Sequence, residues 1–160
     1  MLTGRTDEQE AARFTALFKE KADEIMVDCT QLYPGVPEVL QKLKRDGYRV
    51  GIVTTKYRYR IEDILKRFNG TEWIDLIVGG DNVKVEKPDP EGLLWAIDKL
   101  GVEKDEILYV GDSLVDAKTA ANAGVRFAAV LTGTTTREAF AGYDPVMIAE
   151  NVVEVYRGCI

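Results

Sequence analysis

The chain of 160 residues has the length of one ordinary domain and can bury about 68–70% of its unfolded surface, so its core needs no disulfide or metal. Its 21 Lys and Arg against 27 Asp and Glu give a net charge of -6, which excludes a general attraction to nucleic acid or an anionic membrane. Because the chain has no histidine, any catalysis must use carboxylates, lysine, hydroxyls or thiols.

The hydrophobic segments and the cysteines indicate the cellular compartment in which the protein is expected. Apolar runs such as residues 127–131 are far shorter than the roughly 20 residues that span a bilayer. Residues 1–10 show neither the basic nor the apolar region of an export signal. Cys29 and Cys159 are too few for a disulfide framework. These features predict a cytoplasmic protein.

A long amphipathic helix is expected first, over residues 6–27, because apolar side chains recur there at steps of three and four. Thr6, followed by acidic residues and by Gln9, is typical of a helix N-cap. Pro and Gly in residues 33–37 then interrupt the chain, and residues 38–45 return to helical spacing.

From residue 49 onward, short apolar strands alternate with helices. The strands are predicted at 49–54, 76–78, 107–110 and 126–131, and the helices at 61–68, 91–100 and 113–123. Residues 145–148 are expected to add an edge strand, with a short helix after Asn151, and residues 132–137 are expected to be a loop. This alternation predicts an α/β fold in which a parallel sheet carries helices on both faces.

Polar side chains follow the predicted strands, at the edge of the sheet where ligands bind in such folds. They are Thr54, Thr55 and Lys56, then Asp81 and Lys87, then Asp112, Ser113 and Asp116. Two acids four residues apart at a strand-to-helix turn suit Mg²⁺ better than zinc, and the lysine and threonines can hold phosphate oxygens. The alternating cations and aromatics of residues 56–60 are interpreted as a solvated helix face, not as a nucleic-acid patch.

Three segments carry a resemblance to a known family. They are Val53-Thr54-Thr55-Lys56, Glu86-Lys87-Pro88-Asp89-Pro90 and Val110-Gly111-Asp112-Ser113-Leu114-Val115-Asp116. From about residue 30 to its end the chain resembles the haloacid dehalogenase-like (HAD) superfamily, and within it the phosphoglycolate phosphatase-like group. The resemblance implies a Rossmann-like core, and residues 33–37 resemble the chain's return from a helical cap into that core.

The resemblance also implies roles for individual residues. Thr54 and Lys87 would be catalytic, with Thr54, Thr55 and Lys87 binding phosphate. Asp112 would ligate Mg²⁺ with support from Asp116. The implied substrate is a small phosphorylated metabolite, hydrolysed through an aspartyl-phosphate intermediate.

One family feature is missing from these 160 residues. The family's first strand ends in an Asp-x-Asp-x-Thr motif that supplies the nucleophile and the general acid, and no Asp-x-Asp occurs here. The nearest substitute is Asp28, in the segment 25–30, which lacks a second aspartate. The expected domains are therefore residues 1–32, a remnant of the cap, and 33–160, a core without its nucleophile strand and with an incomplete, weak Mg²⁺ site.

Three functions stay open at this point. The first, implied by the resemblance, is a Mg²⁺-dependent phosphomonoester hydrolase that is inactive as this isolated chain. The second is a non-catalytic fragment or degenerate paralogue that serves as a phosphate-binding, metal-binding or assembly module. A phospho-acceptor receiver domain fits less well, because its acids precede its Thr and Lys along the sequence.

The absent strand would lie between the strands that end at Thr54 and Val110, so two sheet edges would be left unpaired. Unpaired edges favour self-association, for example as a homodimer.

Overall fold

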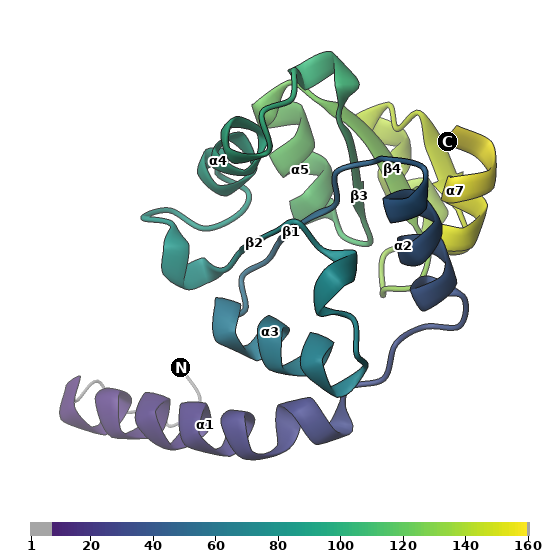
Figure 1. The fold of residues 1–160 in the computed structure, drawn as a ribbon. Coiled ribbons are helices and arrows are strands. Elements are labelled where there is room, and N and C mark those ends of the chain that lie inside the picture. Colours follow the sequence, from purple (N-terminus) through teal and green to yellow (C-terminus); the bar gives the residue numbers. More distant parts are fainter. Residues whose placement is uncertain (1–7, 160) are drawn as a thin grey trace. The chain divides into compact units, whose positions relative to one another are not determined.

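The computed structural model describes residues 8–159, and the predicted N-cap Thr6 lies outside them. The helices are α1 (Glu8–Cys29), α2 (Val36–Arg45), α3 (Arg58–Arg67), α4 (Glu91–Leu100), α5 (Leu114–Ala123), α6 (Arg137–Phe140) and α7 (Val152–Cys159) (Figure 1). The strands are β1 (Gly51–Val53), β2 (Leu76–Val78), β3 (Leu108–Gly111), β4 (Arg126–Val130) and β5 (Met147–Ala149). Among these described helices, none combines the length and the apolar character needed to cross a bilayer.

The chain divides between Gln31 and Leu32 into two compact units. The first contains α1, on which Phe14, Leu17, Phe18 and Ile25 are exposed. Phe14 and Phe18 lie one turn apart and stack with 6.5 Å between ring centroids. All strands of the described residues, and all the residues predicted for the site, lie in the second unit.

The strands of the second unit are all parallel, so the predicted α/β class is confirmed. β1 pairs with β2, while β4 lies between β3 and β5 in a second sheet. Within residues 8–159 no hydrogen-bonded ladder joins β1 to β3. These are the two strands that the sequence expects to flank an absent one.

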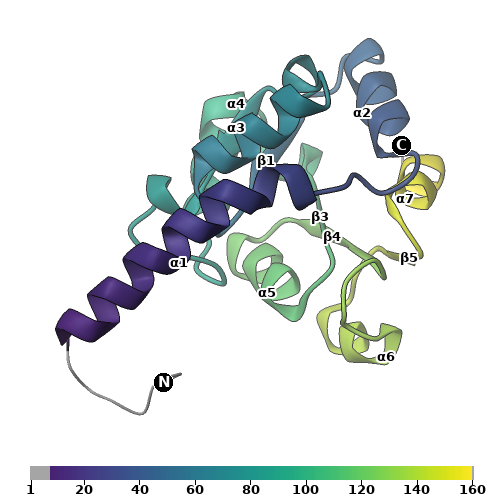
Figure 2. The same cartoon turned by 90° about the horizontal axis from the view of Figure 1, so that it is seen from below.

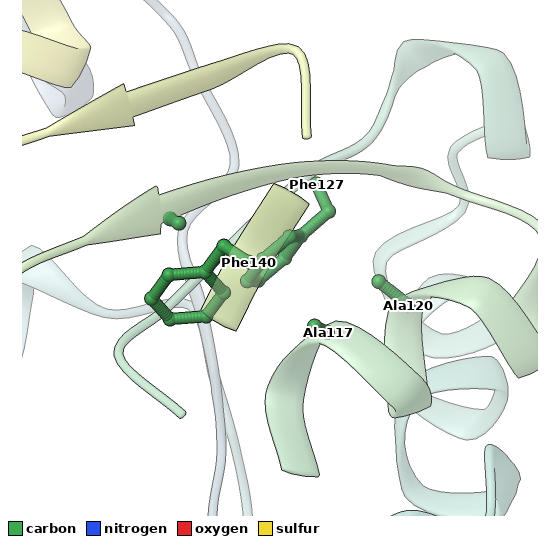
Figure 3. Close-up of a cluster of buried hydrophobic side chains, with 5 residues drawn as sticks. Ala117, Ala120, Phe127 and Phe140 are labelled. Atoms are coloured by element: carbon green, nitrogen blue, oxygen red, sulfur yellow. The ribbon is translucent and has the colours of Figure 1, made fainter. Parts of the chain in front are cut away.

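Helices cover both faces of the second sheet (Figure 2). Phe127 and Ala129 of β4 point to one face, where they meet α5 and the wholly buried Phe140 of α6 (Figure 3). Ala128 and Val130 point to the opposite face and pack with β5 and α7. Because successive residues of a strand face opposite sides, a strand buried on both faces must be apolar throughout, as β4 is after Arg126.

Two local features of the second unit differ from the prediction. Helix α3 begins at Arg58, not at residue 61, and Arg60 is buried with its guanidinium over the rings of Tyr57 and Tyr59, at 5.1 and 5.7 Å from the centroids. The interpretation of residues 56–60 as a solvated face is therefore wrong for Arg60, because the aromatic rings beside it shield its charge from water. Helix α6, which holds Phe140, was not predicted.

Candidate phosphate and metal site

Lys87 and Asp116 form an ion pair at the carboxyl ends of β1 and β3. The Lys87 Nζ donates to Asp116 Oδ1 at 2.7 Å, and the two side chains are only 16% and 9% exposed. Nζ also lies 3.4 Å from the Val53 carbonyl oxygen of β1 and 3.5 Å from the Tyr109 hydroxyl of β3. One ammonium group therefore contacts residues of both sheets.

Asp116 is positioned by the first turn of α5. Ser113 is the N-cap of this helix, and its Oγ accepts the Asp116 N–H at 3.2 Å while donating to Asp116 Oδ2 at 2.5 Å. Burial alone would raise the pKa of Asp116, but the hydrogen bonds from Lys87 and Ser113 outweigh it and hold the pKa below its ordinary value. Asp116 is therefore an anion at neutral pH.

Tyr109 completes the surroundings of Asp116. Its hydroxyl donates to Asp116 Oδ1 at 3.2 Å, and its ring packs against Phe127. Burial and the negative charge of Asp116, with a smaller contribution from Asp112, raise the pKa of Tyr109 far above its ordinary value, so the phenol keeps its proton. Sequence reasoning missed this residue, because a tyrosine in an apolar strand looks like part of the core.

Thr54 and Thr55 line one small pocket together with Lys87. The pocket has a volume of about 10 Å³, room for about one water molecule, and Gly79, Glu86 and Gly92 contribute to its wall. Thr54 is half-buried and its N–H donates to the Val78 carbonyl at 2.9 Å, which fixes the end of β1, while Thr55 is exposed. The three residues predicted to bind phosphate are thus brought together.

Asp112 is half-buried in the turn between β3 and α5. It lies against Gly133 so closely that a Cβ at that glycine would be 2.7 Å from Asp112 Oδ2. The charges of Asp112 and Asp116 both contribute to the raised pKa of Tyr109, so both predicted metal ligands lie within electrostatic range of its hydroxyl. In the part of the chain from 8 to 159, however, no three Asp, Glu or Cys side chains gather as a metal site would require.

Asp28, the nearest substitute for the missing nucleophile, lies in the last turn of α1. In the family the nucleophile ends a strand, whereas residues 25–29 are helical here. Asp28 belongs to the first unit, and the ion pair belongs to the second.

Comparison with known proteins places the chain in a family. The haloacid dehalogenase-like hydrolase family matches residues 2–130. Phosphoglycolate phosphatase 1 of Pseudomonas aeruginosa is 34% identical over 146 residues, which are 91% of this chain and 53% of that protein. Pyrophosphatase PpaX of Bacillus velezensis is 34% identical over 142 residues, or 89% of this chain and 64% of that protein. The chain thus spans only about half to two thirds of the length of these two relatives.

Solved structures agree with this placement. A haloacid dehalogenase-like hydrolase of Bacteroides fragilis superposes with a TM-score of 0.90 at 44% identity, covering 96% of this chain and 73% of the other. A predicted phosphoglycolate phosphatase of Haemophilus somnus gives a TM-score of 0.87 at 27% identity, covering 98% and 69% of the two chains. The chain therefore belongs to the haloacid dehalogenase-like hydrolase family.

Proposed function

We propose that these 160 residues carry the phosphate-binding and metal-binding half of a phosphomonoester hydrolase site of the phosphoglycolate phosphatase type. The observation that carries this proposal is the buried Lys87–Asp116 ion pair, which lies beside Thr54 at the carboxyl ends of β1 and β3. A cation with hydroxyl donors at such an edge suits a small phosphorylated acid. The similarity to phosphoglycolate phosphatase and pyrophosphatase relatives supports the same class of substrate.

The proposed roles follow from the positions of the donors. Thr54 and Thr55 would hydrogen-bond the phosphoryl oxygens, and Lys87 would neutralise their charge. To do so, the Lys87 ammonium must share its hydrogen bonds between Asp116 and the phosphate. Its contacts with Val53 and Tyr109 are long enough to be exchanged at little cost.

Mg²⁺ fits these residues in part. Asp112 and Asp116 are hard-oxygen donors, and Mg²⁺ in proteins needs only one or two carboxylates because it keeps several waters. Asp116, however, already accepts hydrogen bonds from Lys87, Ser113 and Tyr109. Bound Mg²⁺ would supply positive charge to the phosphate oxygens, and we expect it to bind weakly.

We expect no turnover from this chain alone. Asp112 and Asp116 are assigned to the metal side of the site, and Asp81, which follows β2, accepts the Arg58 N–H at 2.7 Å. Without an aspartate in position to attack phosphorus, the covalent route is absent and only binding remains. The alternative proposal, a binding or assembly module, shares this half-site and differs only in having no catalytic partner.

Two measurements test the proposal. Calorimetry with phosphoglycolate and Mg²⁺ should show binding that Lys87→Met abolishes and that Lys66→Met, a change at an exposed ion pair, leaves intact. Equal binding by the wild type and Lys87→Met would refute the site. Hydrolysis of p-nitrophenyl phosphate, phosphoglycolate or pyrophosphate should not exceed a blank, whereas Mg²⁺-dependent turnover abolished by Asp28→Ala would make Asp28 the nucleophile.

A further inference from the structure

Tyr109 connects the apolar core to the Lys87–Asp116 ion pair through a single side chain. Within β3, Leu108 and Val110 pack on the face of the sheet that α7 covers. The Tyr109 ring lies on the opposite face, against Phe127 and beside buried residues of α4 and α5. Close packing fixes the ring, so the hydroxyl has a defined position beside Asp116.

Two donors share one oxygen of the Asp116 carboxylate. Oδ1 accepts the Lys87 Nζ at 2.7 Å and the Tyr109 hydroxyl at 3.2 Å. Oδ2 accepts the Ser113 Oγ at 2.5 Å and the Ser113 N–H at 3.2 Å. Among the described residues, the Tyr109 hydroxyl is therefore the second donor to the oxygen that Lys87 holds.

This sharing matters because phosphate and Asp116 compete for the same ammonium group. In the proposed function, Lys87 donates to a phosphoryl oxygen as well as to Asp116. A buried carboxylate oxygen that loses its donor is costly, and the Asp116 side chain is only 9% exposed, so little water can replace the lysine. The Tyr109 hydroxyl can keep Oδ1 hydrogen-bonded while the lysine turns toward phosphate.

We infer that Tyr109 is a positioning residue, whose hydroxyl keeps Asp116 Oδ1 hydrogen-bonded and thereby releases the Lys87 ammonium to bind phosphate. The inference rests on the proposed function for the identity of the ligand. It differs in sign from a role in packing alone. Because the hydroxyl competes with Lys87 for one oxygen, its removal strengthens the ion pair and weakens phosphate binding, whereas damaged packing would weaken both.

The first measurement is a titration of the full chain with inorganic phosphate in Mg²⁺-free buffer, followed by amide shifts. Tyr109→Phe keeps the ring and removes only the oxygen. It should bind phosphate about fivefold more weakly, because the hydrogen bond of 3.2 Å to the carboxylate is lost. The matched control is Tyr156→Phe, which removes a hydroxyl that donates to Asp46 at 3.0 Å and should leave phosphate binding unchanged.

The Asp116→Asn background shows whether the hydroxyl acts through the carboxylate. In that background Lys87 has no ion pair to leave, so adding Tyr109→Phe should change the phosphate affinity by less than about twofold. An undiminished fivefold loss in this background would mean that the hydroxyl acts on phosphate directly, which would overturn the positioning role.

The second measurement needs no ligand. Urea unfolding of the single and double variants Lys87→Met and Asp116→Asn gives the coupling between the two residues as a ratio of unfolding constants. This ratio should be about fivefold larger with Phe at position 109 than with Tyr, and unchanged in Tyr156→Phe.

Three results would overturn the inference: a coupling that is equal or smaller in Tyr109→Phe, a phosphate affinity equal to that of the wild type, or a Tyr109→Phe variant that does not fold. Absence of phosphate binding by the wild type would instead refute the proposed function. The coupling in the ligand-free protein would then still decide whether the hydroxyl competes with Lys87 for Asp116.

Discussion

Removing the Lys87 ammonium should destabilise the protein because it leaves a buried carboxylate without its counter-charge. Breaking a buried ion pair by deleting one partner costs about 3–5 kcal/mol. Asp116 is 9% exposed, yet it keeps hydrogen bonds from Ser113 and Tyr109. We therefore expect Lys87→Met to lower the free energy of unfolding by about 2–3 kcal/mol.

The double-mutant cycle separates this charge effect from lost packing. Asp116→Asn alone should cost about 2 kcal/mol, and the double variant should be more stable than the sum of the two losses predicts, by about 1.5–2 kcal/mol. The exposed pair Lys66–Asp63, with side chains 64% and 48% exposed, provides the matched control. Lys66→Met should change the free energy by less than about 1 kcal/mol.

Urea unfolding followed by the fluorescence of Trp73 and Trp95, in buffer free of phosphate and Mg²⁺, measures the four proteins of the cycle and the control Lys66→Met. Strictly additive losses would refute the ion pair as the source of the stability. A Lys87→Met variant as stable as the wild type would show that water, not Lys87, compensates the charge of Asp116.

Further predictions concern pH, metal, packing and assembly. Because the pKa of Asp116 is lowered in the folded protein, its contribution to stability should be complete above about pH 5 and be lost as the pH falls through the folded pKa. The free energy of unfolding, measured with urea from about pH 6 to 3, should therefore fall more steeply in the wild type than in Asp116→Asn, which has no carboxylate to protonate. Mg²⁺ should bind at millimolar strength, and amide shifts at Asp112 should vanish in Asp112→Ala. Gly133→Ala should cost about 1–3 kcal/mol of unfolding free energy and weaken Mg²⁺ binding further, because the methyl group displaces the Asp112 carboxylate. Light scattering at low micromolar concentration should show a dimer, and Leu17→Glu with Phe18→Glu should return it to a monomer if the exposed face of α1 forms the contact.

The sequence alone could predict that the site residues lie close together, because the carboxyl ends of parallel strands meet at one edge of a sheet. Alternating apolar strands and helices place Thr54, Lys87 and Asp116 there, whatever the details of the loops. The end of α5 could be predicted for a similar local reason, since Gly124 adopts a φ of +70°, which glycine tolerates. These features depend on short-range pattern and on topology.

Other features depend on tertiary neighbours that periodicity does not reveal. Tyr109 contributes a hydroxyl to Asp116 from within an apolar strand, and Arg60 is buried because two tyrosines flank it. Helix α6 has four residues, too few for a helical period, although its Phe140 is fully buried. The Lys87–Asp116 pair could also not be predicted, because spacing places both residues at one edge without showing that they bond.

An amide-resolved titration with inorganic phosphate in the presence of Mg²⁺ tests most directly whether Thr54, Lys87, Asp112 and Asp116 form one half-site. The account predicts shifts that are concentrated at Thr54, at Lys87 and in residues 111–116, and that disappear in Lys87→Met while persisting in Lys66→Met. Shifts spread over other surfaces, or a response unchanged in Lys87→Met, would contradict it.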